Sequence, residues 1–268
     1  MERLKEKRKG DGGEGERDNA GRERILARPA EKADRWRIGL TGLTPGAGVS
    51  FLTACLAGYL AEKEGWTPAV AELGDGGLYD SLGMERRFIY REYRSFLRAA
   101  TGSVNLHSLS NMEEGVNWAL KTPAEQSERP GYREALRLIY GISGDAVLFD
   151  LSGRNDEEGW LLLKEMDLIL GVVDPMPARL LAGRSTLERW KLSGLPVRIL
   201  VNKDNRGVDR KELQRFLKIR RPETIPYLDP RYLYSVQYRG GMPWGEPEIR
   251  RQLEPAFHRL FSGLCGGL

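Results

Sequence analysis

The sequence contains little of what marks several specialised classes of protein. It holds only 2 cysteines and 2 histidines among 268 residues, and neither residue type recurs at metal-ligand spacing. Two cysteines also exclude a small disulfide-stabilised fold and are typical of a reducing, cytoplasmic protein. No run of roughly 18 apolar residues is present, so the sequence predicts neither a membrane-spanning helix nor a secretion signal. The 42 basic and 38 acidic side chains give a net charge of +4, which is too even to indicate an extended nucleic-acid-binding surface.

The first residues of the chain are rich in charge and poor in apolar side chains. Residues 1–34 mix Lys, Arg, Glu, Asp and Gly, and such a segment buries too little surface to offset the entropy of ordering. We expect a disordered charged tail. Because both signs of charge occur in similar numbers, a solvated tail is favoured over an arm that recruits a partner. Residues 35–268 are expected to form the α/β domain.

From residue 36 onward, β-prone apolar runs alternate with helical patterns. The runs at 146–149 and 168–173 are continuously apolar, as expected for strands that are buried on both faces. The alternation predicts a mostly parallel, doubly wound sheet with helices on both faces. The predicted strands are 37–41, 68–73, 104–109, 146–151, 167–173, 197–202 and 224–226, and the predicted helices are 50–63, 90–99, 132–140, 158–165, 178–192, 209–218 and 246–262.

The first strand-to-helix turn has the composition of a phosphate-binding loop. Residues 41–50 read Thr-Gly-Leu-Thr-Pro-Gly-Ala-Gly-Val-Ser. Gly46 and Gly48 let backbone amides converge, and a helix that starts at Val49 offers unpaired N–H groups to an anion. The standard motif has lysine before its Ser/Thr, where this chain has Val49. The predicted binding residues of the loop are Thr44, Gly46, Ala47, Gly48, Val49, Ser50 and Phe51.

The chain resembles the MinD/ParA-type family in this loop, in the helix that follows it and in the later strands. Members of that family are P-loop ATPases of the SIMIBI class with a deviant Walker A loop. The resemblance covers residues 35–263. The family's second, signature lysine corresponds to Thr44, so the P-loop NTPase fold would here lack both loop lysines. Ser50 matches the family's magnesium-binding Ser/Thr, and Asp150 matches its Walker B aspartate. The resemblance therefore implies a Mg²⁺ site at these two residues.

Other positions of the family pattern are partly retained. Glu72 and Gly74 stand where the family has Asp-x-Asp, and Asp75 is displaced by one residue from the water-positioning aspartate. Asp75 is thus the single candidate catalytic residue, and its side chain reaches the site only if the loop bulges. Asn202 and Pro226 match the family's adenine contacts.

The resemblance implies a nucleotide-binding or pseudo-ATPase scaffold or localisation factor. Its cofactors would be ATP or ADP with Mg²⁺, and its partners a second copy of the chain, paired across the nucleotide face, and another protein. The family's CpaE/TadZ group has similarly decayed loops, but its usual receiver domain has no counterpart here. One alternative is a weak ATPase in which Arg154 or Lys203 reaches the phosphates, because phosphoryl transfer depends on positive charge. Another is a DNA-associated partition-type module, although nucleic acid is the less favoured partner.

Two segments have competing interpretations. Residues 86–94 interleave arginines with aromatics, and an amphipathic helix with inward aromatics is favoured over a nucleic-acid contact. At the C-terminus, Phe257, Leu260, Phe261 and Leu264 recur at helical spacing. MinD proteins end in a membrane-surface helix, so peripheral membrane contact is an alternative, but packing in the core is favoured.

Overall fold

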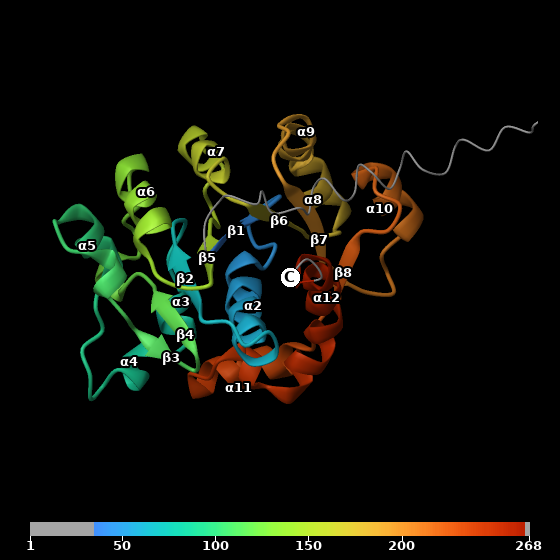
Figure 1. Cartoon of the computed structure of the whole chain (residues 1–268). Helices are drawn as coiled ribbons and strands as arrows, with labels where there is room; N and C mark the ends of the chain where they lie inside the picture. The colour runs from blue at the N-terminus through green and yellow to red at the C-terminus, as the bar shows by residue number, and fades with distance from the viewer. Residues whose placement is uncertain (1–34, 266–268) are drawn as a thin grey trace, which may run out of the picture.

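A computed structural model describes residues 35–265, with side chains to residue 262. The predicted tail, 1–34, and the side chain of Leu264 lie outside the described residues. The described part contains an eight-stranded sheet of order β3-β4-β2-β5-β1-β6-β7-β8, seen nearly edge-on in Figure 1. All neighbouring pairs are parallel except β3 and β4. The strands are β1 (Trp36–Gly42), β2 (Pro68–Glu72), β3 (Met112–Glu113), β4 (Val116–Ala119), β5 (Ala146–Asp150), β6 (Leu168–Val173), β7 (Val197–Asp204) and β8 (Glu223–Pro226).

Helices cover both faces of this sheet, which confirms the predicted doubly wound α/β fold. One face packs against α2 (Val49–Lys63), α3 (Leu78–Ser81), α4 (Met84–Arg87), α11 (Pro230–Arg239) and α12 (Pro247–Cys265). The other packs against α5 (Phe96–Thr101), α6 (Tyr132–Gly141), α7 (Glu157–Leu163), α8 (Pro177–Ala182), α9 (Arg184–Leu192) and α10 (Arg210–Leu217). The 3₁₀ turns η1 (Leu106–Ser108), η2 (Pro123–Glu125) and η3 (Pro243–Gly245) lie between these elements. Each face therefore has its own hydrophobic core.

The burial of the central strands is expected from their apolar sequences. Every residue of β5 and of β6 is buried, because both strands lie between other strands and under helices on both sides. β1 lies between them. The turn after β1 therefore stands at the middle of the carboxyl edge of the sheet, where ligands of such folds bind.

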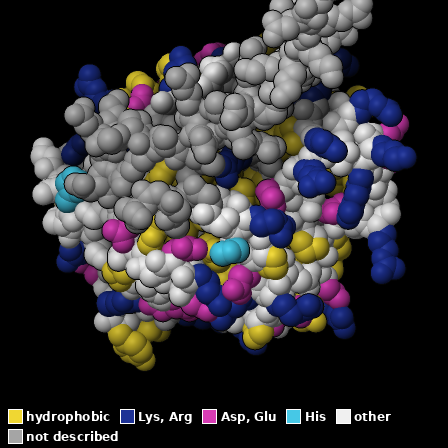
Figure 2. All heavy atoms as spheres, turned by 45° about the vertical axis from the view of Figure 1, so that its right-hand side comes forward, with side chains coloured by type: hydrophobic (Ala, Val, Ile, Leu, Met, Phe, Trp, Pro, Cys, Tyr) yellow, Lys and Arg dark blue, Asp and Glu magenta, His cyan; other side chains and the backbone are white. Residues whose placement is uncertain are grey.

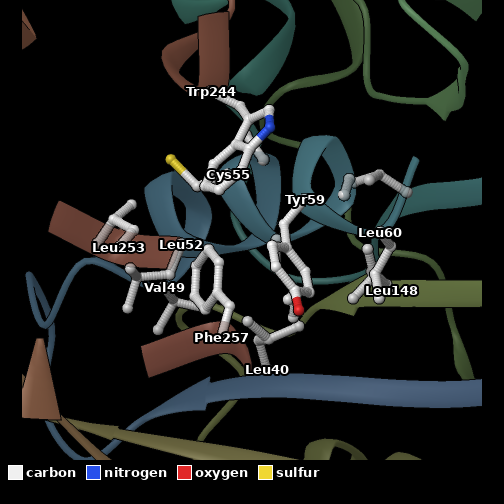
Figure 3. Close-up of a cluster of buried hydrophobic side chains, with 14 of the residues drawn as sticks. Leu40, Val49, Leu52, Cys55, Tyr59, Leu60, Leu148, Trp244, Leu253 and Phe257 are labelled. Carbon is white, nitrogen blue, oxygen red and sulfur yellow. The ribbon is translucent and has the colours of Figure 1, made fainter. Parts of the chain in front are cut away.

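The last helix belongs to the core. Phe257 is fully buried and meets Tyr59 of α2 with ring centroids 5.6 Å apart; both are drawn with Trp244 in Figure 3. Leu260 and Phe261 are also buried. This confirms core packing for the three described side chains of the C-terminal pattern, so none of them is exposed for membrane contact. No helix in the described part of the chain is long and apolar enough to span a membrane.

The segment between β2 and α6 differs most from the prediction. The predicted helix 90–99 is only partly correct: α4 ends at Arg87 and α5 begins only at Phe96, capped by the Ser95 hydroxyl, which accepts from the Arg98 N–H. The expected inward packing of aromatics holds for Phe88 but not for Tyr90, which is 97% exposed.

The strand expected at 104–109 is also wrong, and a hairpin of β3 and β4 takes its place at the sheet edge. Its two-residue loop is Glu114-Gly115, with φ of 48° and 78°. Two positive φ values define the turn type that fits a tight hairpin, but glutamate is unusual there, so the sequence signal for a hairpin is missing. Two further differences are α11, which was not predicted, and a break at Gly183 that divides the predicted helix 178–192 into α8 and α9.

Candidate functional site

The turn between β1 and α2 is open rather than collapsed. Gly46 and Gly48 adopt φ of 75° and 97°, the left-handed region that glycine reaches without strain. A hollow of about 260 Å³ lies against the loop, a size that suits a phosphate chain rather than a whole nucleotide. Its lining comprises Gly42, Thr44, Pro45, Gly46, Ala47, Gly48, Val49, Ser50, Phe51, Asp75, Ser152, Gly153 and Asn155. All seven predicted loop residues therefore line one hollow.

Ser50 lines this hollow, and the Asp150 carboxyl group lies close to the Ser50 hydroxyl group. Asp150 ends β5 and is fully buried, and one carboxylate oxygen accepts from the Ser152 N–H at 2.9 Å. Burial raises the pKa of Asp150, and the nearby hydroxyl groups of Ser50 and Ser152 partly oppose this. Its other oxygen, Oδ2, makes no hydrogen bond within the described residues, nor does the buried Oγ1 of Thr44. Unpaired buried polar atoms are rare in folded proteins, so both atoms are candidates to bind a ligand.

No lysine or arginine is among the described residues that line the hollow. Val49 is 5% exposed and belongs to the core around α2. Arg154, one of the two cations considered as substitutes for the loop lysines, is buried and donates to the carbonyl groups of Leu73 and Pro130. Its guanidinium group therefore holds neighbouring loops together and does not face the phosphate loop.

The other side of the loop, by contrast, is in contact with cations. Lys203 donates from Nζ to the Gly46 carbonyl at 2.7 Å and pairs with Asp174 at 2.9 Å. Arg179 of α8 donates to the Pro45 carbonyl at 2.7 Å. Asp174 and Arg179 were not identified from the sequence, although an aspartate directly after the apolar strand β6 could have drawn attention to that strand end.

Asn202 and Pro226, the two residues that match the family's adenine contacts, lie in different surroundings. Asn202 is buried, and its side-chain amide donates to the Ala47 carbonyl at 2.8 Å. It therefore supports the loop directly. Pro226 ends β8 and is partly buried. The next residue, Tyr227, lines a larger hollow of about 700 Å³ between α8 and α10, which Lys203 and Asp174 also line. This larger hollow is within the usual size range of small-molecule pockets.

Asp75 reaches the phosphate hollow through a bulge after β2. The N–H groups of Leu73 and Gly74 both donate to the Asp150 carbonyl, so two residues oppose one, as in a β-bulge. A Cβ on Gly74 would lie 2.0 Å from the Ser152 carbonyl oxygen, so only glycine fits there. Asp75 lines the hollow, and its carboxylate pairs with Arg129 at 2.7 Å.

Two buried ionisable residues, Glu72 and Lys121, lie next to this bulge. Glu72 accepts from the backbone N–H groups of Leu78 and Lys121, at 2.9 and 2.8 Å. Burial raises the pKa of Glu72 to about 7, although these two hydrogen bonds oppose the rise. The Lys121 ammonium donates to the Gly74 carbonyl, and burial lowers its pKa. Lys121 was missed because it follows β4, a strand that was itself not predicted.

Comparison with known proteins shows likeness in structure. No protein-family model and no curated protein matches the sequence. Among solved structures, MinD of Pyrococcus horikoshii OT3 in complex with Mg-ADP aligns with a TM-score of 0.67 at 15% identity, over 87% of this chain and 100% of that one. MinD in the MinC:MinD complex of Aquifex aeolicus aligns with a TM-score of 0.65 at 18% identity, over 85% and 96%.

A plasmid partition protein of Borrelia burgdorferi B31 bound to AMPPNP aligns with a TM-score of 0.66 at 13% identity, over 85% of this chain and 98% of that one. The three alignments cover nearly the whole of each solved chain. The chain has the fold of the MinD/ParA-type P-loop ATPases.

Proposed function

We propose that this protein binds ADP or ATP with Mg²⁺ at the turn between β1 and α2 and hydrolyses ATP poorly or not at all. It would act as a nucleotide-dependent scaffold or localisation factor, in the manner of a pseudo-ATPase. Two structures of the same fold contain Mg-ADP and AMPPNP, which supports nucleotide as the class of ligand.

One observation carries this proposal. The loop keeps an open hollow lined by Gly46, Gly48 and Ser50, and Asp150, which lies close to Ser50, has a buried carboxylate oxygen without a hydrogen-bond partner among the described residues. An empty structural turn has no need of a buried carboxylate oxygen without a partner, because such an oxygen is unfavourable unless something binds it. Amide groups at the start of a helix bind phosphate without any lysine.

The residues present fit a magnesium ion that is shared with phosphate. Mg²⁺ prefers oxygen ligands, and in nucleotide sites it keeps waters and uses one or two protein groups with the phosphates. Ser50 and Asp150 are the side chains that would hold it. No group of three or more His, Cys, Asp or Glu that could hold a metal occurs in the described part of the chain, so the ion would depend on bound nucleotide. When bound, it would neutralise phosphate charge.

Weak hydrolysis follows from the charges around the hollow. Phosphoryl transfer depends on positioning and on positive groups that stabilise the transferring phosphate, and removing one such group costs about a hundredfold or more in rate. The described lining offers no cation, and the Asp75 carboxylate is held by Arg129. Binding and turnover are therefore expected to be separable.

A protein partner and a homodimer complete the proposal. The Aquifex structure is a complex of MinD with MinC, which supports assembly with another protein as a use of this fold. Pairing of two copies across the nucleotide face would place the hollow at the dimer contact, and nucleotide would then control assembly.

A basic surface favours the DNA-associated module as the second candidate function. Residues 206–221 contain seven cations, Arg206, Arg210, Lys211, Arg215, Lys218, Arg220 and Arg221, against Asp209 and Glu212. All seven are exposed, and Figure 2 brings this side of the molecule forward, with dark blue side chains spread over it. DNA binding that weakens steeply with salt would support this candidate.

Calorimetry with ADP and ATP, each with and without Mg²⁺, tests the leading proposal. We expect saturable binding that Mg²⁺ strengthens, and a turnover assay that shows little phosphate release. Restoring lysine at Val49 and Thr44 is the companion experiment, since a working loop should gain affinity or rate. Absence of binding by the unaltered chain, together with no change in the lysine variants, would refute the proposal.

A further inference from the structure

Three consecutive carbonyl groups of the phosphate loop each accept a hydrogen bond from a side chain. The Pro45 carbonyl accepts from Arg179, the Gly46 carbonyl from Lys203 and the Ala47 carbonyl from Asn202, at 2.7, 2.7 and 2.8 Å. The donors come from two different segments, α8 and the end of β7. The peptide planes of the loop are therefore fixed from outside.

Fixing a carbonyl group also fixes the amide of the same peptide. The C=O of one residue and the N–H of the next lie in one plane and point in opposite directions. Holding the carbonyls of residues 45, 46 and 47 on the outer side therefore turns the N–H groups of Gly46, Ala47 and Gly48 to the other side. That side is the hollow lined by the same loop. Successive amides that converge in this way form an anion-binding nest.

A β-bulge lets two neighbouring side chains reach the loop. In a regular strand Asn202 and Lys203 would point to opposite faces. Here the register between β7 and β8 shifts between Val201 and Asp204, and Lys203 has φ of 64°. Bulges re-aim side chains, and a positive φ in a residue with a Cβ is a strained conformation that the surroundings must maintain.

Asp174 anchors the two cations. Its Oδ2 lies 2.9 Å from Lys203 Nζ and 3.5 Å from Arg179 Nε, and its other oxygen accepts from the Met176 N–H at 3.1 Å. Asp174 is 7% exposed, whereas the side chains of Lys203 and Arg179 are 34% and 42% exposed. A buried carboxylate thus holds two half-exposed cations against the loop.

We propose that Arg179, Asn202 and Lys203 are positioning residues that replace the missing loop lysines, by holding the loop open before ligand binds and placing positive charge behind it. This inference rests on the proposed function and specifies how the ligand is recognised. The site binds a diphosphate group through backbone amides, and its cations act from the carbonyl side of the loop. The affinity then depends on the order of the loop more than on direct contact between cation and phosphate.

Two measurements on the full chain test this. The first is ¹⁵N relaxation of Gly46, Ala47 and Gly48 without ligand, and the second is calorimetric titration with inorganic pyrophosphate and with ADP. In the double variant K203A/R179A we expect the order parameters of these amides to fall from about 0.85 to below about 0.6. We also expect pyrophosphate affinity to fall about tenfold or more, because two hydrogen bonds from charged donors are lost. K203R should restore much of the loss of a K203A single variant.

D174N separates positioning from simple attraction. This change removes a negative charge beside the site, so attraction alone predicts tighter pyrophosphate binding. Positioning predicts binding weaker by at least about threefold, because the anchor of both cations is lost. Glu212→Gln is the matched control, since Glu212 lines the larger hollow near Lys203, and positioning predicts little effect there.

The outcomes distinguish this inference from the proposed function. Unchanged order parameters in K203A/R179A, or tighter binding by D174N, would overturn the positioning role even if nucleotide binds well. Loss of loop order without any pyrophosphate or ADP binding by the unaltered chain would support the positioning role and overturn the diphosphate ligand. Loss of both loop order and affinity supports the whole inference.

Discussion

Gly48 lies directly against Asn202: a Cβ on residue 48 would sit 2.4 Å from Nδ2 of Asn202. The same glycine has φ of 97° and precedes α2. The left-handed backbone and the close approach of the amide are therefore two separate reasons for glycine at this position. They connect the composition of the loop to the strand end that supports it.

The first prediction follows from this contact. Gly48→Ala should destabilise the protein by about 1–2 kcal/mol from the left-handed backbone alone and should abolish most nucleotide binding, because Asn202 is displaced from the Ala47 carbonyl. Chemical denaturation and calorimetry measure the two effects. Gly65→Ala is the matched control, since Gly65 has φ of 66° but nothing within 4 Å of an added Cβ. It should show the backbone penalty with unchanged binding, and an equal loss of binding in both variants would contradict the account.

The second prediction concerns the bulge after β2. In Gly74→Ala the new Cβ would lie 2.0 Å from a backbone oxygen of Ser152, so the two strand ends must separate. We expect a loss of roughly 1–3 kcal/mol in the free energy of unfolding, as for other overpacked buried sites, and displacement of Asp75 from the hollow.

Gly102→Ala serves as the control for this second prediction, because its nearest contact with an added Cβ is 3.7 Å. Urea denaturation compares the two. A stability of Gly74→Ala within 0.5 kcal/mol of the control, the usual range of harmless surface changes, would show that the bulge is not as tight as described.

The third prediction is a pH dependence of stability that arises from Glu72. Its pKa in the folded chain is about 7, above the ordinary value of 4.5, so the folded state binds this proton more tightly than the unfolded chain does. The stabilisation from that proton is complete below pH 4.5 and is lost as the pH rises through 7. Relative to Glu72→Gln, the unaltered protein should lose up to about 1.4 kcal/mol per pH unit in this window, about 3 kcal/mol in all. Urea denaturation at pH 5, 6, 7 and 8 measures the difference, and a difference that is independent of pH would disprove the assignment.

The fourth prediction is that replacing Asp150 impairs function without lowering stability. This buried carboxylate has one oxygen without a partner in the described residues, which is unfavourable in the folded state. Asp150→Asn should therefore leave the free energy of unfolding unchanged or raise it by about 1–2 kcal/mol. It should also remove the effect of Mg²⁺ on nucleotide affinity. A variant that is clearly destabilised while Mg²⁺ still strengthens binding would assign Asp150 a structural role only.

Much of the fold could be predicted from the sequence because its central strands have a strong signal. β5 and β6 are continuous apolar runs, and β1, the glycine-rich turn and α2 follow one another without interruption. The hairpin of β3 and β4 could not be predicted in the same way, because Glu114 adopts a conformation that its residue type disfavours. The helix α11 has an ordinary cap at Asp229 followed by Pro230, a helix-start signal that the sequence does carry.

The site could be predicted only in part. The loop follows from its glycine-rich composition between a strand and a helix, whereas Ser50 and Asp150 are expected only from the resemblance to the MinD/ParA-type family. The proposed roles of Asp174, Arg179 and Lys203 depend on the order β1-β6-β7 in the sheet and on a bulge in β7. Strand order and bulges arise from packing across the whole sheet, so no local pattern reports them.

The most direct test of the central claim is to follow the amide signals of Gly46, Ala47 and Gly48 by ¹H–¹⁵N NMR while Mg-ADP is added to the full chain. Amides that bind a diphosphate should shift strongly and saturate together at a single affinity, with Ser50 among the affected residues. If ADP leaves these three amides unmoved, or shifts only residues elsewhere on the protein, the loop is not a phosphate site.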